Sequence, residues 1–229
     1  MRGIISQSNF LPWRGYFACL REVEILIMYD SEQYTRRDWR NRNKIWNNES
    51  WEWLSVPIQS KGNYLSAINS IKLFDSSAIP SAINRIKNRY AAYSKTQGYE
   101  FVIKLLSEST VYEYLSDVNK FTTSKICEYL KIDLKIFTQE IDFQKMDKNM
   151  KLIQICNNFG IQRYFTGPTS RSYIDEEIFA KNGIEVTYFN FDNLIKTTDP
   201  VEYSIAHYII TEDMQRLLNL TTLRQSPRQ

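Results

Sequence analysis

The sequence predicts an α/β protein with a Rossmann-like, mostly parallel sheet flanked by helices. Two observations predict this class. Short apolar segments alternate with helix-periodic segments at both ends of the chain. Glu24–Tyr29 is apolar on both faces, as expected for a strand inside a parallel sheet. From the length of 229 residues we expect one domain over 1–220, with a helical insertion at about 79–132 and a flexible tail at 221–229.

In the first half, β-rich runs alternate with turn signals. The loop after the first strand is punctuated by Pro12 and Gly15. The predicted elements are strand Gly3–Gln7, helix Tyr16–Val23, strand Glu24–Tyr29, strand Trp51–Ile58 and a possible strand at Ile68–Phe74.

The middle of the chain reads as helical, because apolar residues recur at three- and four-residue spacing. A second αβ alternation follows it. Gly160 and Gly183 stand where helix C-termini favour glycine. The predicted elements are helices Ile79–Tyr93, Gly98–Ser109 and Val111–Ile132, strand Leu134–Gln139, helix Asp147–Gly160, strand Arg163–Gly167, helix Ile174–Gly183 and strand Ile184–Phe191.

Composition narrows the functional classes. The net charge of +3 gives no general signal for nucleic acid, so any basic site must be local. The three cysteines are scattered, His207 is the only histidine, and no metal is expected. No apolar run approaches the roughly 18 residues that span a membrane. We therefore expect a cytoplasmic protein without membrane contact.

The segment Asp30–Trp46 directly follows a predicted core strand and is rich in cations and aromatics. Arginines can hold phosphates through bidentate bonds, and aromatic rings can stack on a base or sugar. The alternative is a solvated charged face. If the chain is helical after Asp38, its arginines divide between two faces. The cations are Arg36, Arg37, Arg40, Arg42 and Lys44, and the aromatics are Tyr34, Trp39 and Trp46.

Other candidate segments follow predicted strands, at the edge where open α/β sheets bind ligands. The loop after the first strand carries Trp13 and Tyr16; the alternative is an aromatic loop that packs on the core. The stretch Gly167–Asp175 could bind an anion, or Asp175 could simply cap a helix. The same two alternatives apply to the pair Asp147 and Lys148. His207 lies on a predicted helix, where it is either a core residue or a base.

Four stretches together resemble the WbqC-like family: "ISQSNFLPWRGYF", "YDSEQYTRRDWRNRNKI", "LSVPI" and the region from "DKNMKL" to "YFNFD". The resemblance runs from Ile4 to about Asp192. This chain has Ser8 where the family pattern has proline, and "SIAH" (Ser204–His207) where it has Ser-Ile-Ile-Asp. The matching positions are Gln7, Asn9, Trp13, Gly15, Tyr16, Asp30, Gln33, Tyr34, Trp39, Asn41, Arg42, Pro57, Gly167, Pro168, Tyr173 and Asp175.

The resemblance implies a role in O-antigen or other surface-polysaccharide synthesis, attaching an amino acid such as glycine to a nucleotide-linked amino sugar. We therefore predict an aminoacyl or acyl transferase acting on a dTDP- or UDP-linked amino sugar. Asp30 is the first candidate base and His207 the second. The cofactor and the acyl donor are unknown, since no CoA or ATP motif is present. The predicted substrate-binding residues are Gln7, Asn9, Trp13, Tyr16, Gln33, Tyr34, Arg36, Trp39, Arg40, Asn41, Arg42, Gly167, Pro168, Tyr173 and Asp175.

Two alternatives stay open. A non-catalytic nucleotide-sugar-binding module would use the same arginines without needing Asp30 or His207. An RNA-binding protein that takes an aminoacyl-tRNA would use the segment Asp30–Trp46, although the modest net charge argues against this as the main function.

Overall fold

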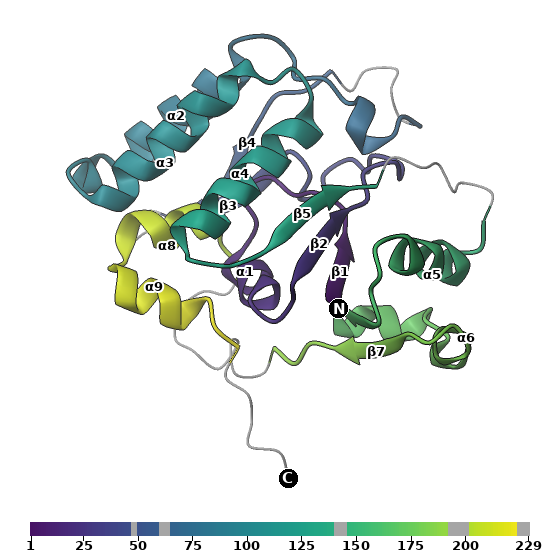
Figure 1. The fold of residues 1–229 in the computed structure, drawn as a ribbon. Helices are drawn as coiled ribbons and strands as arrows, with labels where there is room; N and C mark the ends of the chain where they lie inside the picture. The colour runs from purple at the N-terminus through teal and green to yellow at the C-terminus, as the bar shows by residue number, and fades with distance from the viewer. Residues whose placement is uncertain (47–49, 60–64, 140–145, 192–201, 224–229) are drawn as a thin grey trace.

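The computed structural model describes residues 1–46, 50–59, 65–139, 146–191 and 202–223. At its centre lies a five-stranded parallel sheet, in the order β5-β2-β1-β6-β7 (Figure 1). The predicted Rossmann-like fold class is confirmed. The strands are β1 Arg2–Ser6, β2 Ile25–Met28, β5 Lys135–Thr138, β6 Arg163–Thr166 and β7 Glu185–Tyr188.

The strand order reverses at β1. From β1 the chain continues to β2 and β5 on one side of the sheet, and it then crosses to the other side of β1, where β6 and β7 lie. In open α/β sheets, ligands bind outside the carboxyl ends of the strands at such a reversal. We therefore expect a ligand site at the carboxyl ends of β1 and β6.

Both faces of the sheet are buried, which explains why every residue of β2 is apolar. Leu26 and Met28 contribute to one hydrophobic core, while Ile25 and Ile27 contribute to the second. The second core is covered by α5 and α6, and the larger first core by the remaining helices. The helices covering the second core are α5 Lys148–Asn158 and α6 Glu176–Lys181.

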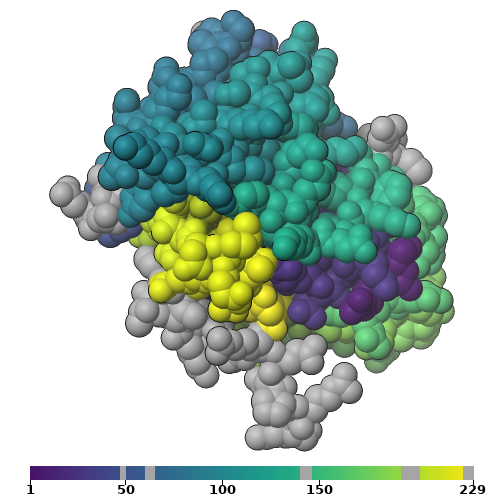
Figure 2. Space-filling model, turned by 60° about the vertical axis from the view of Figure 1, so that its left-hand side comes forward, coloured from purple at the N-terminus to yellow at the C-terminus, as the bar shows by residue number. Residues whose placement is uncertain are grey.

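The predicted helical insertion lies between β4 and β5 and consists of α2 Ala78–Arg89, α3 Gln97–Glu108 and α4 Leu115–Tyr129. The first core is also covered by α1 Arg14–Leu20, α8 Ile205–Thr211 and α9 Met214–Leu220. Figure 2 shows the two C-terminal helices, in yellow, next to the middle helices. The contact of α3 with α8 is close, because a Cβ on Gly98 would lie 1.7 Å from the carbonyl oxygen of Ile209. The helix α9 was not predicted.

A separate two-stranded antiparallel sheet consists of β3 Arg42–Trp46 and β4 Trp51–Ser55. The conditional prediction of a helix after Asp38 is therefore wrong from residue 42 onward. The reason is an alternation of period two, in which Asn43 and Ile45 are buried and their neighbours are only partly buried.

The prediction of a strand at Ile68–Phe74 is also wrong. A 3-10 turn, η1 Ile68–Ser70, occupies its first half. The backbone amides of Ile68 and Asn69 donate to the carbonyl oxygens of Glu32 and Asp30, so the first half of the segment bonds to the loop after β2. In the second half, Lys72 and Leu73 form only isolated antiparallel bridges, with Tyr114 and Ile58. Three further 3-10 turns are η2 Ala91–Tyr93, η3 Ser109–Val111 and η4 Pro168–Ser172.

The predicted helix ends are confirmed. Gly160 and Gly183 follow α5 and α6 with φ of +66° and +74°, in the left-handed region that glycine adopts without strain. The three cysteines are free thiols and buried. Within the described ranges, every helix falls short of the length and apolarity needed to cross a membrane. Of the predicted tail, residues 224–229 lie outside the described part, and the division into domains stays a prediction.

Candidate functional site

A cleft of about 570 Å³ lies at the carboxyl ends of β1 and β6, where the strand order reverses. We call it the carboxyl-edge cleft. Its lining combines apolar and aromatic side chains with charged and amide side chains. The lining residues are Ile5, Ser6, Gln7, Tyr29, Glu32, Met146, Lys148, Lys151, Leu152, Tyr164, Thr166 and Tyr173.

Two lysines supply the positive charge of this cleft. Lys148 and Lys151 stand three residues apart on α5 and so lie on one face of the helix. The ammonium of Lys151 lies 2.9 Å from the carboxylate of Glu32, and that of Lys148 lies 3.3 Å from the centre of the Tyr173 ring. Both lysines are thus oriented toward the cleft by residues that line it.

The turn after β6 is attached to the start of α5 by Asn149. Its amide nitrogen donates to the carbonyl oxygen of Tyr173 at 3.1 Å, and its side-chain oxygen accepts from the backbone amide of Asp175 at 3.0 Å. These two bonds hold Tyr173 beside Lys148. The predicted residues Gly167 and Pro168 form the start of this turn, at η4.

The helix N-termini near the cleft are already capped. The carboxylate of Asp147 accepts from the amides of Asn149 and Met150, and that of Asp175 accepts from Glu177 and Ile178. Asp175 is therefore a helix cap, which is one of its two predicted roles. Since these amides are occupied, an anion in the cleft would be held by lysine side chains.

A second cavity, of about 410 Å³, is lined by Asn9, Pro12, Trp13, Trp39, Asn43 and Glu202. We call it the tryptophan pocket. The Trp13 ring lies against the backbone of Gly15, because a Cβ on Gly15 would be 2.0 Å from a Trp13 ring atom. The Asn43 side chain donates to the carbonyl oxygen of Leu11 at 2.8 Å, which joins β3 to the loop that carries Trp13.

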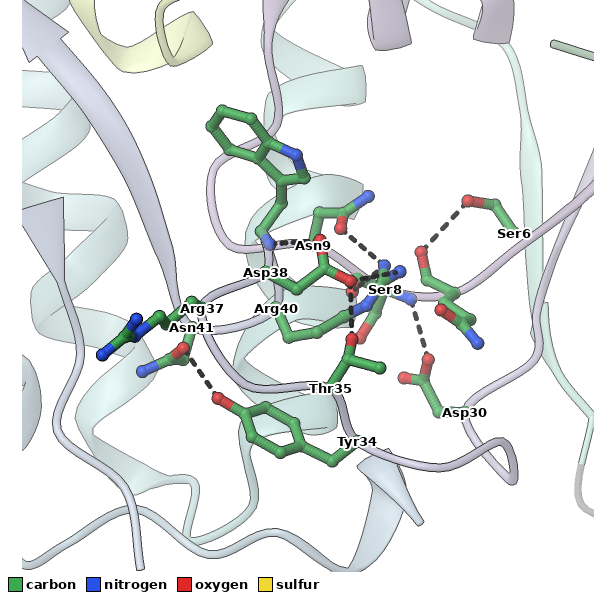
Figure 3. Close-up of polar contacts among 12 residues, drawn as sticks. Ser6, Ser8, Asn9, Asp30, Tyr34, Thr35, Arg37, Asp38, Arg40 and Asn41 are labelled. Carbon is green, nitrogen blue, oxygen red and sulfur yellow. Dashed lines mark hydrogen bonds and ion pairs between the residues drawn. The ribbon is translucent and has the colours of Figure 1, made fainter. Parts of the chain in front are cut away.

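Residues Gln7–Asn9 connect the two linings, because Gln7 lines the cleft and Asn9 lines the pocket, and we call this segment the ridge. Figure 3 shows how the ridge is held from below. The amide of Ser8 donates to the carboxylate of Asp30 at 2.7 Å. The guanidinium of Arg40 donates to the carbonyl oxygen of Ser8 at 3.1 Å and to the side-chain oxygen of Asn9 at 2.6 Å.

Asp30 is only 1% exposed, and it lines neither cavity. Burial raises its pKa above the usual aspartate value, although the bonds from Ser8 oppose this shift. For Asp38, burial also acts to raise the pKa, but hydrogen bonds from Thr35 and Trp39 lower it overall. The visible role of Asp30 is to anchor the ridge, and its role as a base stays a prediction.

His207 lies on α8 within the first core, away from the linings of both cavities. Its Nδ1 is 3.1 Å from the hydroxyl of Tyr90, and its ring packs edge-on against Tyr203 and Tyr208. Asp30 and His207 therefore line neither the cleft nor the tryptophan pocket, and His207 as a base also stays a prediction.

Two of the predicted arginines contact the protein itself. Arg40 is held by Ser8 and Asn9 and lies 3.4 Å from the carboxylate of Asp38. Arg42 lies 3.9 Å from the centre of the Trp53 ring and also donates to the carbonyl oxygen of Arg37. Their predicted contact with a diphosphate stays a prediction.

The remaining predicted residues divide by location. Tyr34 is buried and its hydroxyl donates to Asn41 at 3.0 Å, while the Asn41 amide donates to Val56 at 2.9 Å. Burial raises the pKa of the Tyr16 hydroxyl on α1. Gln33 and Arg36 lie on the exposed part of the loop. The structure thus brings Gln7 and Tyr173 to the cleft, and Asn9, Trp13 and Trp39 to the pocket.

Sequence reasoning missed several residues of these cavities. Lys151 had an available signal, because it stands one helical turn after the candidate Lys148. Glu32 and Glu202 had none, because their positions depend on pairing with Lys151 and Lys44 from distant segments.

The comparisons with known proteins agree with these motifs. The family model of the "WbqC-like protein family" matches residues 7–199. The chain belongs to the WbqC-like family. Among relatives of this WbqC-like protein is "Uncharacterized protein Rv1507c" of Mycobacterium tuberculosis (strain ATCC 25618 / H37Rv), 33% identical over 192 residues, which covers 82% of this chain and 81% of the relative. No solved structure matches the chain.

Proposed function

We propose that this WbqC-like protein is a transferase that forms an amide on the amino group of a nucleotide-linked amino sugar, for surface-polysaccharide synthesis such as that of O-antigen. The observation that carries the proposal is the carboxyl-edge cleft. It lies at the strand-order reversal, and Lys148 and Lys151 both face it.

The diphosphate of a dTDP- or UDP-linked sugar fits the charge of this cleft. Lysine ammonium groups are strong donors to phosphate oxygens, and such charge-assisted bonds are about twice as strong as neutral ones. Tyr164 and Tyr173 add aromatic faces to the lining. We therefore assign the diphosphate to Lys148 and Lys151, and we assign Arg40 to holding the ridge.

The reaction would join two groups. The neutral sugar amine attacks the carbonyl carbon of an activated acyl or aminoacyl donor, and a base takes the proton that the nitrogen loses as the amide forms. The amide C–N bond forms, and the donor's leaving group departs with the electron pair of its bond to that carbon. Glu32 lines the cleft and Glu202 lines the tryptophan pocket, so these two carboxylates join Asp30 and His207 as candidates for the base.

Calorimetric titration with dTDP- and UDP-linked amino sugars tests the proposal. We expect binding to at least one of them, and a loss of about 10-fold in affinity in Lys151→Met. Lys125→Met is a matched control, because Lys125 pairs with Glu128 on the surface of α4 and lines neither cavity. If the wild-type protein binds neither nucleotide sugar, the proposal fails.

A non-catalytic nucleotide-sugar-binding module is the second candidate. It is favoured by the burial of Asp30 and His207 outside both cavities. Asp30→Asn, Glu32→Gln and His207→Gln separate the two candidates. Turnover in the wild type that one variant loses while binding is kept supports the enzyme. Binding without turnover, over a panel of aminoacyl and acyl donors that includes aminoacyl-tRNA, supports the module.

A further inference from the structure

We propose that the tryptophan pocket holds the sugar ring of the nucleotide-linked substrate. This inference rests on the proposed function, because it assumes that the diphosphate occupies the carboxyl-edge cleft. It goes beyond that proposal by assigning the two parts of one ligand to two cavities.

The lining of the pocket suits a sugar ring. Trp13 and Trp39 provide large apolar surfaces, against which the C–H face of a pyranose can pack. A cavity of about 410 Å³ falls in the range of small-molecule sites, which combine apolar walls with a few placed polar groups.

The charge of the lining argues against a phosphate. Glu202 contributes a carboxylate, and its partner is the ammonium of Lys44. No described lining residue of the pocket is cationic, whereas two lysines line the cleft. A carboxylate accepts hydrogen bonds from the hydroxyl or amino groups that an amino sugar carries.

The amide of Asn9 is oriented in advance for such a ligand. Its oxygen accepts from Arg40 at 2.6 Å, so its nitrogen points away from the guanidinium, as Figure 3 shows. Because its oxygen is occupied by Arg40, the polar group that Asn9 still offers to a ligand is its N–H donor. Glu202 adds a carboxylate acceptor to the same lining.

The linings of the two cavities come within two residues of each other along the chain. Gln7 lines the cleft and Asn9 lines the pocket, and two residues of chain span at most about 7 Å. A nucleotide sugar crossing the ridge would thus place its diphosphate at the lysines and its sugar at the tryptophans.

The test compares each nucleoside diphosphate with its amino-sugar conjugate in three proteins. UDP, dTDP and their amino-sugar conjugates are titrated into the wild type, Trp39→Ala and Trp51→Ala. Trp51 is the matched control: it is 48% exposed against 40% for Trp39, it also contacts Trp53, and it does not line the pocket. Circular dichroism establishes that each variant is folded.

We expect Trp39→Ala to bind the conjugate at least 10-fold more weakly and to bind the nucleoside diphosphate as the wild type does. Trp51→Ala should bind both unchanged. An equal loss for both ligands would overturn the inference, because the pocket would then hold the base or phosphates. Unchanged binding of the conjugate by Trp39→Ala would also overturn it.

Failure of the proposed function is recognised separately. If the wild type binds no nucleotide, methyl glycosides of the amino sugars are titrated at millimolar concentration with tryptophan fluorescence as the readout. A saturable change in the wild type that Trp39→Ala loses supports the pocket as a sugar site. The absence of any change overturns it.

Discussion

The segments 30–46 and 146–151 both carry cations, but the structure places those cations in different surroundings. The first is conspicuous in the sequence, with five cations, but its Arg40 and Arg42 contact the protein itself. The second is inconspicuous, yet its two lysines line a cleft at the strand-order reversal. The number of cations in a segment is thus a weaker guide to a ligand site than whether those cations line a cavity.

Removing the Arg40 guanidinium should destabilise the protein more than any other substitution considered. In Arg40→Met, the carbonyl oxygen of Ser8, the side-chain oxygen of Asn9 and the carboxylate of Asp38 lose their partner. We expect a loss of about 2–4 kcal/mol in the free energy of unfolding, measured by urea denaturation. A loss below about 1 kcal/mol would show that Arg40 does not hold the ridge.

The complementary prediction concerns Lys151. Its ion pair with Glu32 is partly exposed, so Lys151→Met should change the free energy of unfolding by at most about 1 kcal/mol. Its affinity for a nucleoside diphosphate should fall about 10-fold, or about 1.4 kcal/mol. If Lys151→Met were as destabilising as Arg40→Met and still bound the nucleoside diphosphate as the wild type does, the assignment of Lys151 to the ligand would be contradicted.

The two aspartates of segment 30–46 should contribute to stability with opposite dependence on pH. The pKa of Asp30 is raised by burial, so the folded state holds its proton longer, and the stability from this group falls as pH rises above about 4. The pKa of Asp38 is lowered overall, so its contribution is present above about pH 4 and is lost as pH falls.

Melting temperatures from pH 3 to 7 check both signs. The difference between the wild type and Asp30→Asn should decrease as pH rises, and the difference between the wild type and Asp38→Asn should increase. If both melting-temperature differences changed with pH in the same direction, the opposite pKa shifts of Asp30 and Asp38 would be contradicted.

The smallest effect is expected at Arg42. Its guanidinium lies over the Trp53 ring at the surface of the β3–β4 hairpin, and such contacts contribute about 0.5–1 kcal/mol. Arg42→Gln should therefore lower the free energy of unfolding by about that amount and leave nucleotide affinity unchanged. A clear loss of nucleotide affinity in Arg42→Gln would instead support the contact between Arg42 and the diphosphate that the sequence predicts.

Elements with local signals could be predicted from the sequence. The two-sided apolar pattern of Glu24–Tyr29 predicted an interior parallel strand, because both its faces are buried whatever covers them. Gly160 and Gly183 predicted helix ends, because the left-handed backbone there favours glycine. The family motifs also located Gln7, Asn9, Trp13 and Tyr173, which line the cavities.

Tertiary structure alone decided which charged groups face a cavity. Lys151 pairs with Glu32, 119 residues away along the chain, and Arg40 is held by Ser8, 32 residues away. Electrostatic and hydrogen-bond energies depend on the distance between groups in space, and no local periodicity encodes that distance for segments so far apart in the chain. For the same reason the sequence could not place Asp30 beneath the ridge or His207 beside Tyr90.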